Sequence, residues 1–281
     1  MNKILTVFTV LTLLFVSCKK EKSIETGASN NGSKSSLLTK VVTNTGSDSS
    51  VTIYQYDASG RLIRETTSGS SQGSNLDNDF IIVRNSSGII TQTIQKNPDL
   101  SQSGIDSLVR TVNYDASAKR YTGASQPFSY SGYTGTASTE FIYDQSGKVI
   151  EEDTYANILT VSLLIEKVVY TYSSSGTDIT EAKIYTVDST GSNMALVSTL
   201  NSTYDTKVSP LILSGSEAFA LQRQQFFNAN NAITLQQTDA ATSSSVTYTS
   251  AYTYNASNYP KTASVTTSPG NATSTVTYYY Q

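Results

Sequence analysis

A degenerate repeat of about 29 residues constrains the fold of this chain more than any other feature. Its clearest copies are Tyr54–Ile63 (YQYDASGRLI) and Phe141–Ile150 (FIYDQSGKVI). In each copy, alternating apolar residues end in an aromatic residue, and a polar turn sequence follows. The position before the turn recurs at residues 56, 84, 114, 143, 172, 204, 227 and 254. Spacing of this kind indicates that each repeat is one supersecondary unit.

Each unit is predicted to be a β-hairpin. The Tyr-x-Tyr alternation places two aromatic side chains on one face of a strand, and a short polar residue then opens the turn. These turn residues are Asp57, Asp115, Asp144 and Asn255. Glycines follow where a tight turn needs positive φ, and they are Gly60, Gly88, Gly147 and Gly176. Because about 29 residues hold two strands of about eight to ten residues, eight units predict about 16 strands.

The predicted fold is all-β: an antiparallel meander of about eight hairpins forming one large twisted or curved sheet. One strand face carries Tyr and Val and the other carries Thr, as in 246–254. The stretch 208–227 breaks the rhythm, since Pro210 argues against a central strand. We predict one short helix insertion near 215–227, which packs apolar side chains against one sheet face. Those side chains are Phe219, Leu221 and Phe226.

The N-terminal segment predicts export and attachment to a membrane. Residues 4–16 are an apolar run of thirteen residues, which is shorter than the roughly 20 residues that a spanning helix needs. Phe15-Val16-Ser17-Cys18 resembles the lipobox of bacterial lipoproteins, in which cleavage precedes the cysteine and lipid is attached to its thiol. We therefore divide the chain into a signal peptide (1–17), a lipidated Cys18 with a flexible polar tether (18–36), and a repeat domain (37–281). The alternative is an ordinary signal peptide with an incidental cysteine.

The turn motifs resemble those of a known repeat family. Tyr-Asp-x-x-Gly-Arg-Leu-Ile at 56–63 is similar to the YD repeat of the Rhs/teneurin superfamily, and the copy at 143–150 is similar too. The layout is closer to uncharacterised YD-repeat-like lipoproteins of the Bacteroidota. This resemblance implies a lipid-anchored protein of the bacterial outer membrane, facing either the periplasm or the outside. Eight copies are too few for the shell that Rhs repeats build around a toxin, so that role is not expected.

Composition excludes several kinds of chemistry. The chain has no histidine and one cysteine, so with Cys18 lipidated there is no Ser-His or Cys-His nucleophile and no histidine zinc site. A net charge of −3 does not suggest a nucleic-acid partner. We therefore expect no enzymatic activity and no cofactor. The expected partners are the membrane, through the lipid, and a glycan or another envelope protein.

Four clusters of side chains admit a functional interpretation beside a simpler one. The carboxylates at 151–153 suit glycoside hydrolysis, but neighbours on a strand point to opposite faces, which favours solvated charge. The acidic run at 75–79 offers oxygens for Ca²⁺ but lacks the glycine and distal glutamate of a full loop, which favours a polar turn. The tyrosines suit sugar stacking or sheet packing, and packing is favoured. Ser107 and Ser189 lie in sequences that resemble the O-glycosylation motif of Bacteroidota envelope proteins, although chance matches are common in a chain this rich in Ser and Thr.

Three functions remain open at this point. The first is a non-catalytic envelope lipoprotein that acts as a β-repeat scaffold or as a binding module for a glycan, peptide or envelope protein. The second is an envelope hydrolase that uses carboxylates. The third is an outer-membrane β-barrel, because 16 strands of about ten residues match porin arithmetic, although neither strand face is consistently apolar.

Overall fold

A computed structural model describes residues 37–71, 74–102, 105–130, 133–188, 191, 193–213 and 215–281. The signal peptide, Cys18, the tether, Ser189 and Ser214 lie outside these ranges. The first strands are β1 (Leu38–Thr45), β2 (Asp48–Tyr56), β3 (Leu62–Ser71), β4 (Ser74–Asn75), β5 (Asn78–Arg84), β6 (Ile90–Lys96), β7 (Leu108–Asp115), β8 (Arg120–Tyr130) and β9 (Tyr133–Tyr143). The others are β10 (Val149–Ile158), β11 (Val161–Tyr172), β12 (Ile179–Val187), β13 (Met194–Tyr204), β14 (Ala232–Asp239), β15 (Ser245–Tyr254), β16 (Pro260–Ser268) and β17 (Thr273–Tyr280).

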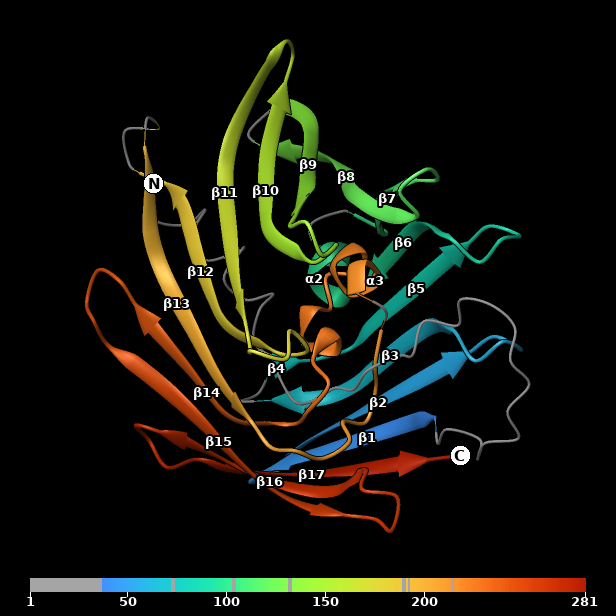
Figure 1. Cartoon of the computed structure of the whole chain (residues 1–281), viewed down its shortest axis with the longest axis vertical. Coiled ribbons are helices and arrows are strands. Elements are labelled where there is room, and N and C mark those ends of the chain that lie inside the picture. Colours follow the sequence, from blue (N-terminus) through green and yellow to red (C-terminus); the bar gives the residue numbers. More distant parts are fainter. Residues whose placement is uncertain are drawn as a thin grey trace.

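The strands form one antiparallel sheet that closes on itself (Figure 1). Of its 17 strands, β4 pairs only with β3, so 16 strands build the wall. β1 pairs with β2 on one side and with β17 on the other, with Leu38 opposite Tyr280 and Thr45 opposite Ser274. The prediction of an all-β antiparallel meander of about 16 strands is confirmed. The prediction of one large twisted or curved sheet is correct only in part, because the first and last strands pair and close the sheet into a barrel.

A β-bulge at every repeat accompanies this closure. The register shifts by one residue at the position before the turn, as between Gln55 and Tyr56, Thr171 and Tyr172, and Thr253 and Tyr254. This position is aromatic except in the β5–β6 hairpin, where it is Arg84. The same shift occurs between Leu38 and Lys40, opposite Tyr280. Bulges bend a strand and increase its twist, and a barrel requires tilted, coiled strands. The eighth hairpin is therefore split: its strands are β17 and β1, at the two ends of the described chain.

The polar turn residues organise one rim of the barrel, which we call the turn rim. Oδ1 of Asp57 accepts hydrogen bonds from the backbone amides of Ser59 and Arg61, both at 2.9 Å. Asn85, Asp144 and Asn255 accept the same pair of bonds in their own turns. The positive φ predicted for the four turn glycines is observed, with φ +76°, +82°, +83° and +70° at Gly60, Gly88, Gly147 and Gly176.

Tyrosine hydroxyls link neighbouring hairpins along this rim. The Tyr56 hydroxyl donates to the carbonyl oxygen of Leu38 at 2.7 Å, and the Tyr280 hydroxyl donates to that of Pro260 at 2.8 Å. Equivalent bonds run from Tyr143 to Tyr121, Tyr172 to Val149, Tyr204 to Ile179, and Tyr252 to Ala232. In each case a tyrosine near the end of one strand bonds to the first or second residue of the strand before it. The tyrosine face points into the barrel, so packing explains the repeated tyrosines.

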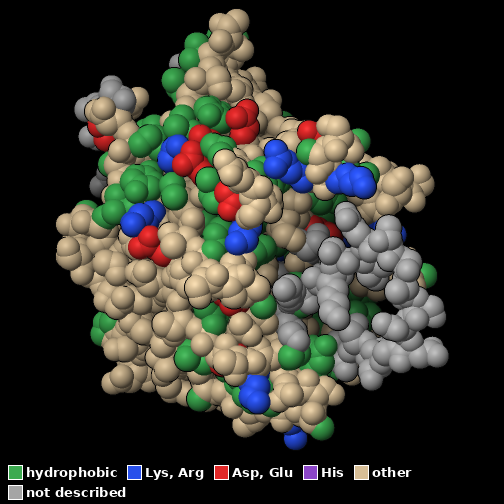
Figure 2. Space-filling model, in the orientation of Figure 1, with side chains coloured by type: hydrophobic (Ala, Val, Ile, Leu, Met, Phe, Trp, Pro, Cys, Tyr) green, Lys and Arg blue, Asp and Glu red, His purple; other side chains and the backbone are tan. Residues whose placement is uncertain are grey.

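The outer face of the wall is largely polar. Outward positions of β15, β16 and β17 alternate with buried ones, and most are Thr or Ser: Thr247, Thr249, Thr253, Thr262, Ser264, Thr266, Thr275 and Thr277. Elsewhere the outer face carries ion pairs, including Arg64 with Asp79 at 2.7 Å and Lys183 with Glu181 at 2.9 Å. In Figure 2 polar side chains and backbone make up most of the visible surface.

The helices are short: α2 (Pro98–Gln102), α3 (Gly215–Ala220) and the 3-10 helix η2 (Gln224–Phe227). Within the described part of the chain, none has the length and hydropathy that a membrane span requires. The insertion predicted near 215–227 exists, but it forms two short helices and not one. It lies inside the ring of strands (Figure 1) and not on an open sheet face. Position 227, taken as a repeat turn, lies in η2, so that assignment is wrong.

Candidate functional site

The barrel interior holds a plug, which we define as residues 205–231 between β13 and β14. Its apolar centre is Phe219, whose ring centroid lies 5.2 Å from that of Tyr170 and 6.2 Å from that of Phe141. Both partners belong to the wall. Ala218, Phe219 and Ala220 have 0% exposed surface. Burial this complete requires contact on all sides, so the plug fills the interior at the level of α3.

Charged groups fix the plug to the wall. Arg84, on β5, forms an ion pair with Glu217, and both side chains are largely buried. Nη1 of Arg110, on β7, donates to the carbonyl oxygen of Ala220 at 2.8 Å, which satisfies a backbone group at the end of α3. Arg223 lies 3.4 Å from Glu65 on β3. Through these charged groups, β3, β5 and β7 hold the plug.

An asparagine-rich segment, 228–231, ends the plug. The backbone amide of Ile179 donates to Oδ1 of Asn228 at 2.7 Å. Asp178 accepts from the backbone amide of Asn230 at 2.9 Å, and Asp205 accepts from Nδ2 of Asn231 at 3.0 Å. These bonds pair buried polar groups that would otherwise be costly to bury.

Glu152 and Arg110 are buried charges beside the plug. Glu152 accepts hydrogen bonds from the Tyr170 hydroxyl and from Nε2 of Gln224, the latter at 2.8 Å. Burial raises the pKa of the Glu152 carboxyl, while these bonds and the charge of Arg110 lower it in part. Burial lowers the pKa of Arg110 to about 10, and Glu152 opposes that shift. This cluster ties the plug to the wall, and nothing in it forms a nucleophile–base pair.

The carboxylates at 151–153 separate as the strand geometry predicts. Glu151 and Asp153 face outward and pair with Lys167, with Asp153 at 3.2 Å, whereas Glu152 faces inward. The description of all three as solvated is wrong for Glu152 and Asp153, which are 6% and 7% exposed. The sequence alone does not show which of these carboxylates faces the interior. That depends on which other side chains line the interior and can pair with a carboxylate.

The acidic run at 75–79 forms a turn and an ion pair. The backbone amide of Asp77 donates to Oδ1 of Asn75 at 2.7 Å, while Asp79 pairs with Arg64. No group of three or more potential metal ligands occurs among the described residues. Of the two serines considered for glycosylation, Ser107 is half-buried just before β7.

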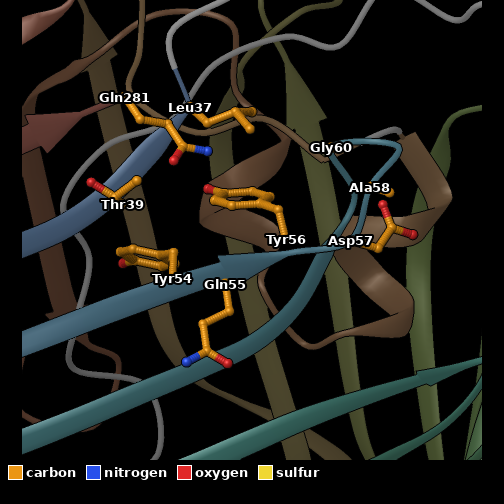
Figure 3. Close-up of a pocket in the computed structure, with 9 residues that line it drawn as sticks. All are labelled: Leu37, Thr39, Tyr54, Gln55, Tyr56, Asp57, Ala58, Gly60 and Gln281. Carbon is orange, nitrogen blue, oxygen red and sulfur yellow. The ribbon is translucent and has the colours of Figure 1, made fainter.

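A hollow of about 570 Å³ opens at the turn rim where β1, β2 and β17 meet (Figure 3). Its lining residues are Leu37, Thr39, Tyr54, Gln55, Tyr56, Asp57, Ala58, Gly60 and Gln281. Tyr54 and Tyr56 lie on one side of β2, toward Thr39 and Gln281, while Gln55 points to the other side. The hollow thus combines aromatic rings with an amide and a hydroxyl, which suits a polar ligand such as a sugar or peptide. Among the residues predicted from the turns, it gathers Asp57 and Gly60.

Comparisons with known proteins identify the fold. No family model matches the sequence, and no curated protein matches it. Among solved structures, the chain is similar to a porin-like protein from Bacteroides vulgatus ATCC 8482, with a TM-score of 0.53, 14% identity, and coverage of 88% of this chain and 99% of that one. It is also similar to a porin-like protein from Bacteroides uniformis ATCC 8492, with a TM-score of 0.51, 14% identity, and coverage of 87% and 96%. At this identity the likeness is one of fold: a closed, antiparallel β-barrel.

Proposed function

We propose that this chain is a non-catalytic β-barrel protein of the bacterial cell envelope, held at the outer membrane by lipid on Cys18 and closed by its own plug. The observation that carries the proposal is the closed 16-strand barrel with a filled interior. Barrel closure and the porin-like neighbours favour a closed β-barrel over the open-sheet scaffold. The lipid anchor rests on the lipobox-like sequence before Cys18.

The side chains of the wall support a barrel that stands in water beside the membrane. A membrane-spanning barrel presents an apolar band about 25 Å tall to lipid, and Arg or Lys at the bilayer midplane costs about 2–4 kcal/mol. Here outward positions carry charges such as Arg64, Lys167 and Lys183, each paired within the outer face. The outer face of β15–β17 is dominated by Thr and Ser, which supply no such band.

The filled interior supports a binding role and not a channel. The plug occupies the lumen with residues such as Phe219, Leu221 and Asn231, which are 0–1% exposed. A porin conducts through a polar, water-filled lumen. The hollow at the turn rim, beside Tyr54 and Gln281, is the place where a glycan or peptide would be bound.

A barrel that spans the outer membrane is the second candidate, and the closed porin-like fold favours it. The two candidates differ in what happens when Cys18 is replaced. If lipid is the principal anchor, Cys18→Ser releases a folded protein into the soluble periplasmic fraction. If the barrel spans the bilayer, Cys18→Ser stays in the membrane pellet after a high-pH carbonate wash and needs detergent for extraction.

The wild-type chain is the matched control in that fractionation, and thermal unfolding followed by circular dichroism checks that the released protein is folded. Retention of the Cys18→Ser protein after the wash would contradict the lipid-anchored proposal and establish the spanning barrel.

A further inference from the structure

The β10–β11 hairpin has an unusual tip. Leu159, at the turn, is 98% exposed and has φ +55°. Positive φ favours Gly, Asn or Asp and is unfavourable for other residues. Among the described non-glycine residues with positive φ, Leu159 is the only apolar one. This tip therefore combines an unfavourable backbone conformation with an exposed leucine, and nothing within the barrel offsets either cost.

Apolar side chains continue from the tip mainly along one face of the hairpin. Ile158 is opposite Val161 on one face, and Val161 is 53% exposed. Leu163, which shares that face, is 52% exposed. On the other face Asn157 is opposite Ser162 next to the tip, and Tyr155 is opposite Leu164 further along. Figure 2 shows hydrophobic side chains on this hairpin, which projects at the top of the view.

Charge is absent from the whole end of the hairpin. Residues 154–165 (TYANILTVSLLI) contain no ionisable group that is charged at neutral pH. Asp153 and Glu166 mark the boundary. The six residues from Asp153 to Leu159 rise about 20 Å at 3.3 Å per residue, which is enough to cross a headgroup region and enter the hydrocarbon of one leaflet.

We propose that the tip of the β10–β11 hairpin inserts into a lipid bilayer and forms a second membrane contact of this protein. Lipid surrounds an inserted segment, so it covers the exposed tip as well as the apolar face, whereas a flat protein surface covers one face. Tyr155 lies between the tip and the charged boundary, at the depth where aromatic rings prefer the interface. This membrane contact is separate from the lipid anchor, and its test uses the Cys18→Ser protein, which lacks that anchor.

The tip and a lipid on Cys18 can reach the same membrane. The tip lies at one rim of the barrel, and β1 begins at the opposite rim, the turn rim. The 19 residues from Cys18 to Leu37 span at most about 65 Å when extended, whereas β11, the longest strand, spans about 40 Å. Contact of the tip and the lipid with one shared membrane depends on the proposed function, whereas insertion of the tip does not.

The experiment uses the secreted full chain with Cys18→Ser and flotation with neutral phosphatidylcholine vesicles. We expect this protein to float with the vesicles. We expect Leu159→Asn to lower the apparent partition coefficient by tenfold or more, while its thermal midpoint stays the same or rises because Asn tolerates positive φ. Leu163→Ser, as a second variant without the backbone effect, is expected to weaken binding as well.

Ile53→Ser is the matched control, because Ile53 is an outward β2 residue that is 45% exposed and far from the tip in the strand order. We expect it to bind vesicles like the Cys18→Ser protein, within twofold. The proposal is overturned if the Cys18→Ser protein fails to float, or if Leu159→Asn binds as strongly. It is also overturned if light scattering shows a dimer that Leu159→Asn converts to monomer without any vesicle binding, since the occupant would then be a second copy.

Discussion

Replacement of Phe219 by alanine tests whether the plug is an integral part of the folded protein. The Phe219 side chain has no exposed surface, and its ring contacts the rings of Phe141, Tyr170 and Phe227. Truncating a buried phenylalanine to alanine costs about 3–5 kcal/mol, because transfer free energy is lost and a cavity remains. We expect a loss in this range, which is a large part of a typical unfolding free energy of about 5–15 kcal/mol.

The assay is urea unfolding of the Cys18→Ser chain with and without Phe219→Ala, monitored by circular dichroism. Tyr279→Ala is the matched control, because Tyr279 is an outward aromatic that is 42% exposed and touches Lys40. Its expected cost is about 1 kcal/mol or less. A cost below about 1 kcal/mol for Phe219→Ala would refute the argument, because the plug would then pack loosely or lie outside the barrel.

Three further perturbations address the rim and the interior. Tyr172→Phe removes the hydroxyl that donates to the carbonyl oxygen of Val149 and is expected to cost about 1 kcal/mol in urea unfolding; a cost equal to that of Tyr279→Phe would deny the rim bonds a stabilising role. Gly147→Val is expected to destabilise the fold by about 1–2 kcal/mol through the backbone conformation alone, because Gly147 has φ +83° and nothing lies within 4 Å of an added Cβ. An unchanged thermal midpoint would contradict this expectation. Glu152 has a raised pKa in the folded state, so its contribution to stability is fully present below the unfolded pKa of about 4.3 and is lost as pH rises through the folded value. The unfolding free energy of Glu152→Gln relative to wild type is therefore expected to increase over that pH window, and a pH-independent difference would refute the shift.

Local structure was predictable from the sequence because its signals are local. The turn at Asp57–Gly60 follows from a short polar acceptor and a glycine at fixed spacing. The Tyr/Val and Thr faces follow from strand alternation. The antiparallel meander follows from the short connections between units. These features need only residues within one repeat.

Closure was not predictable, because it depends on residues more than 200 positions apart. Val42 and Thr277 share no motif, yet they are partners in the β1–β17 ladder. The bulge at each aromatic position bends the sheet, but no residue type marks a bulge of this kind in advance. Position 227 is not a repeat turn, and the unit that completes the eight is formed by β17 and β1, which stand at opposite ends of the chain.

The candidate site was predictable only in part. The break in the repeat rhythm correctly indicated a helical insertion near 215–227, but not that the insertion enters the barrel. The roles of Arg84, Arg110 and Glu152 were missed, because isolated charges in strands usually face solvent. The sequence signal was the Asn-rich stretch 228–231 together with the break at Pro210, which marked an insertion without showing what it contacts.

A cross-link between the first and last strands tests barrel closure most directly. In a Cys18→Ser background, Val42→Cys and Thr277→Cys place two thiols on facing residues of β1 and β17. Facing residues of an antiparallel pair have Cα atoms about 4.5–5.5 Å apart, within the range that a disulfide needs. The control pair is Val42→Cys with Thr262→Cys; Thr262 faces Thr277 from β16, so it is two strands away, at about 10 Å.

Mass spectrometry after mild oxidation of the folded protein gives the readout. The closed barrel predicts a disulfide between residues 42 and 277 in most molecules and little or none between residues 42 and 262. If residues 42 and 277 fail to cross-link in a folded, monomeric protein, the sheet is open and the account of a plugged barrel is wrong.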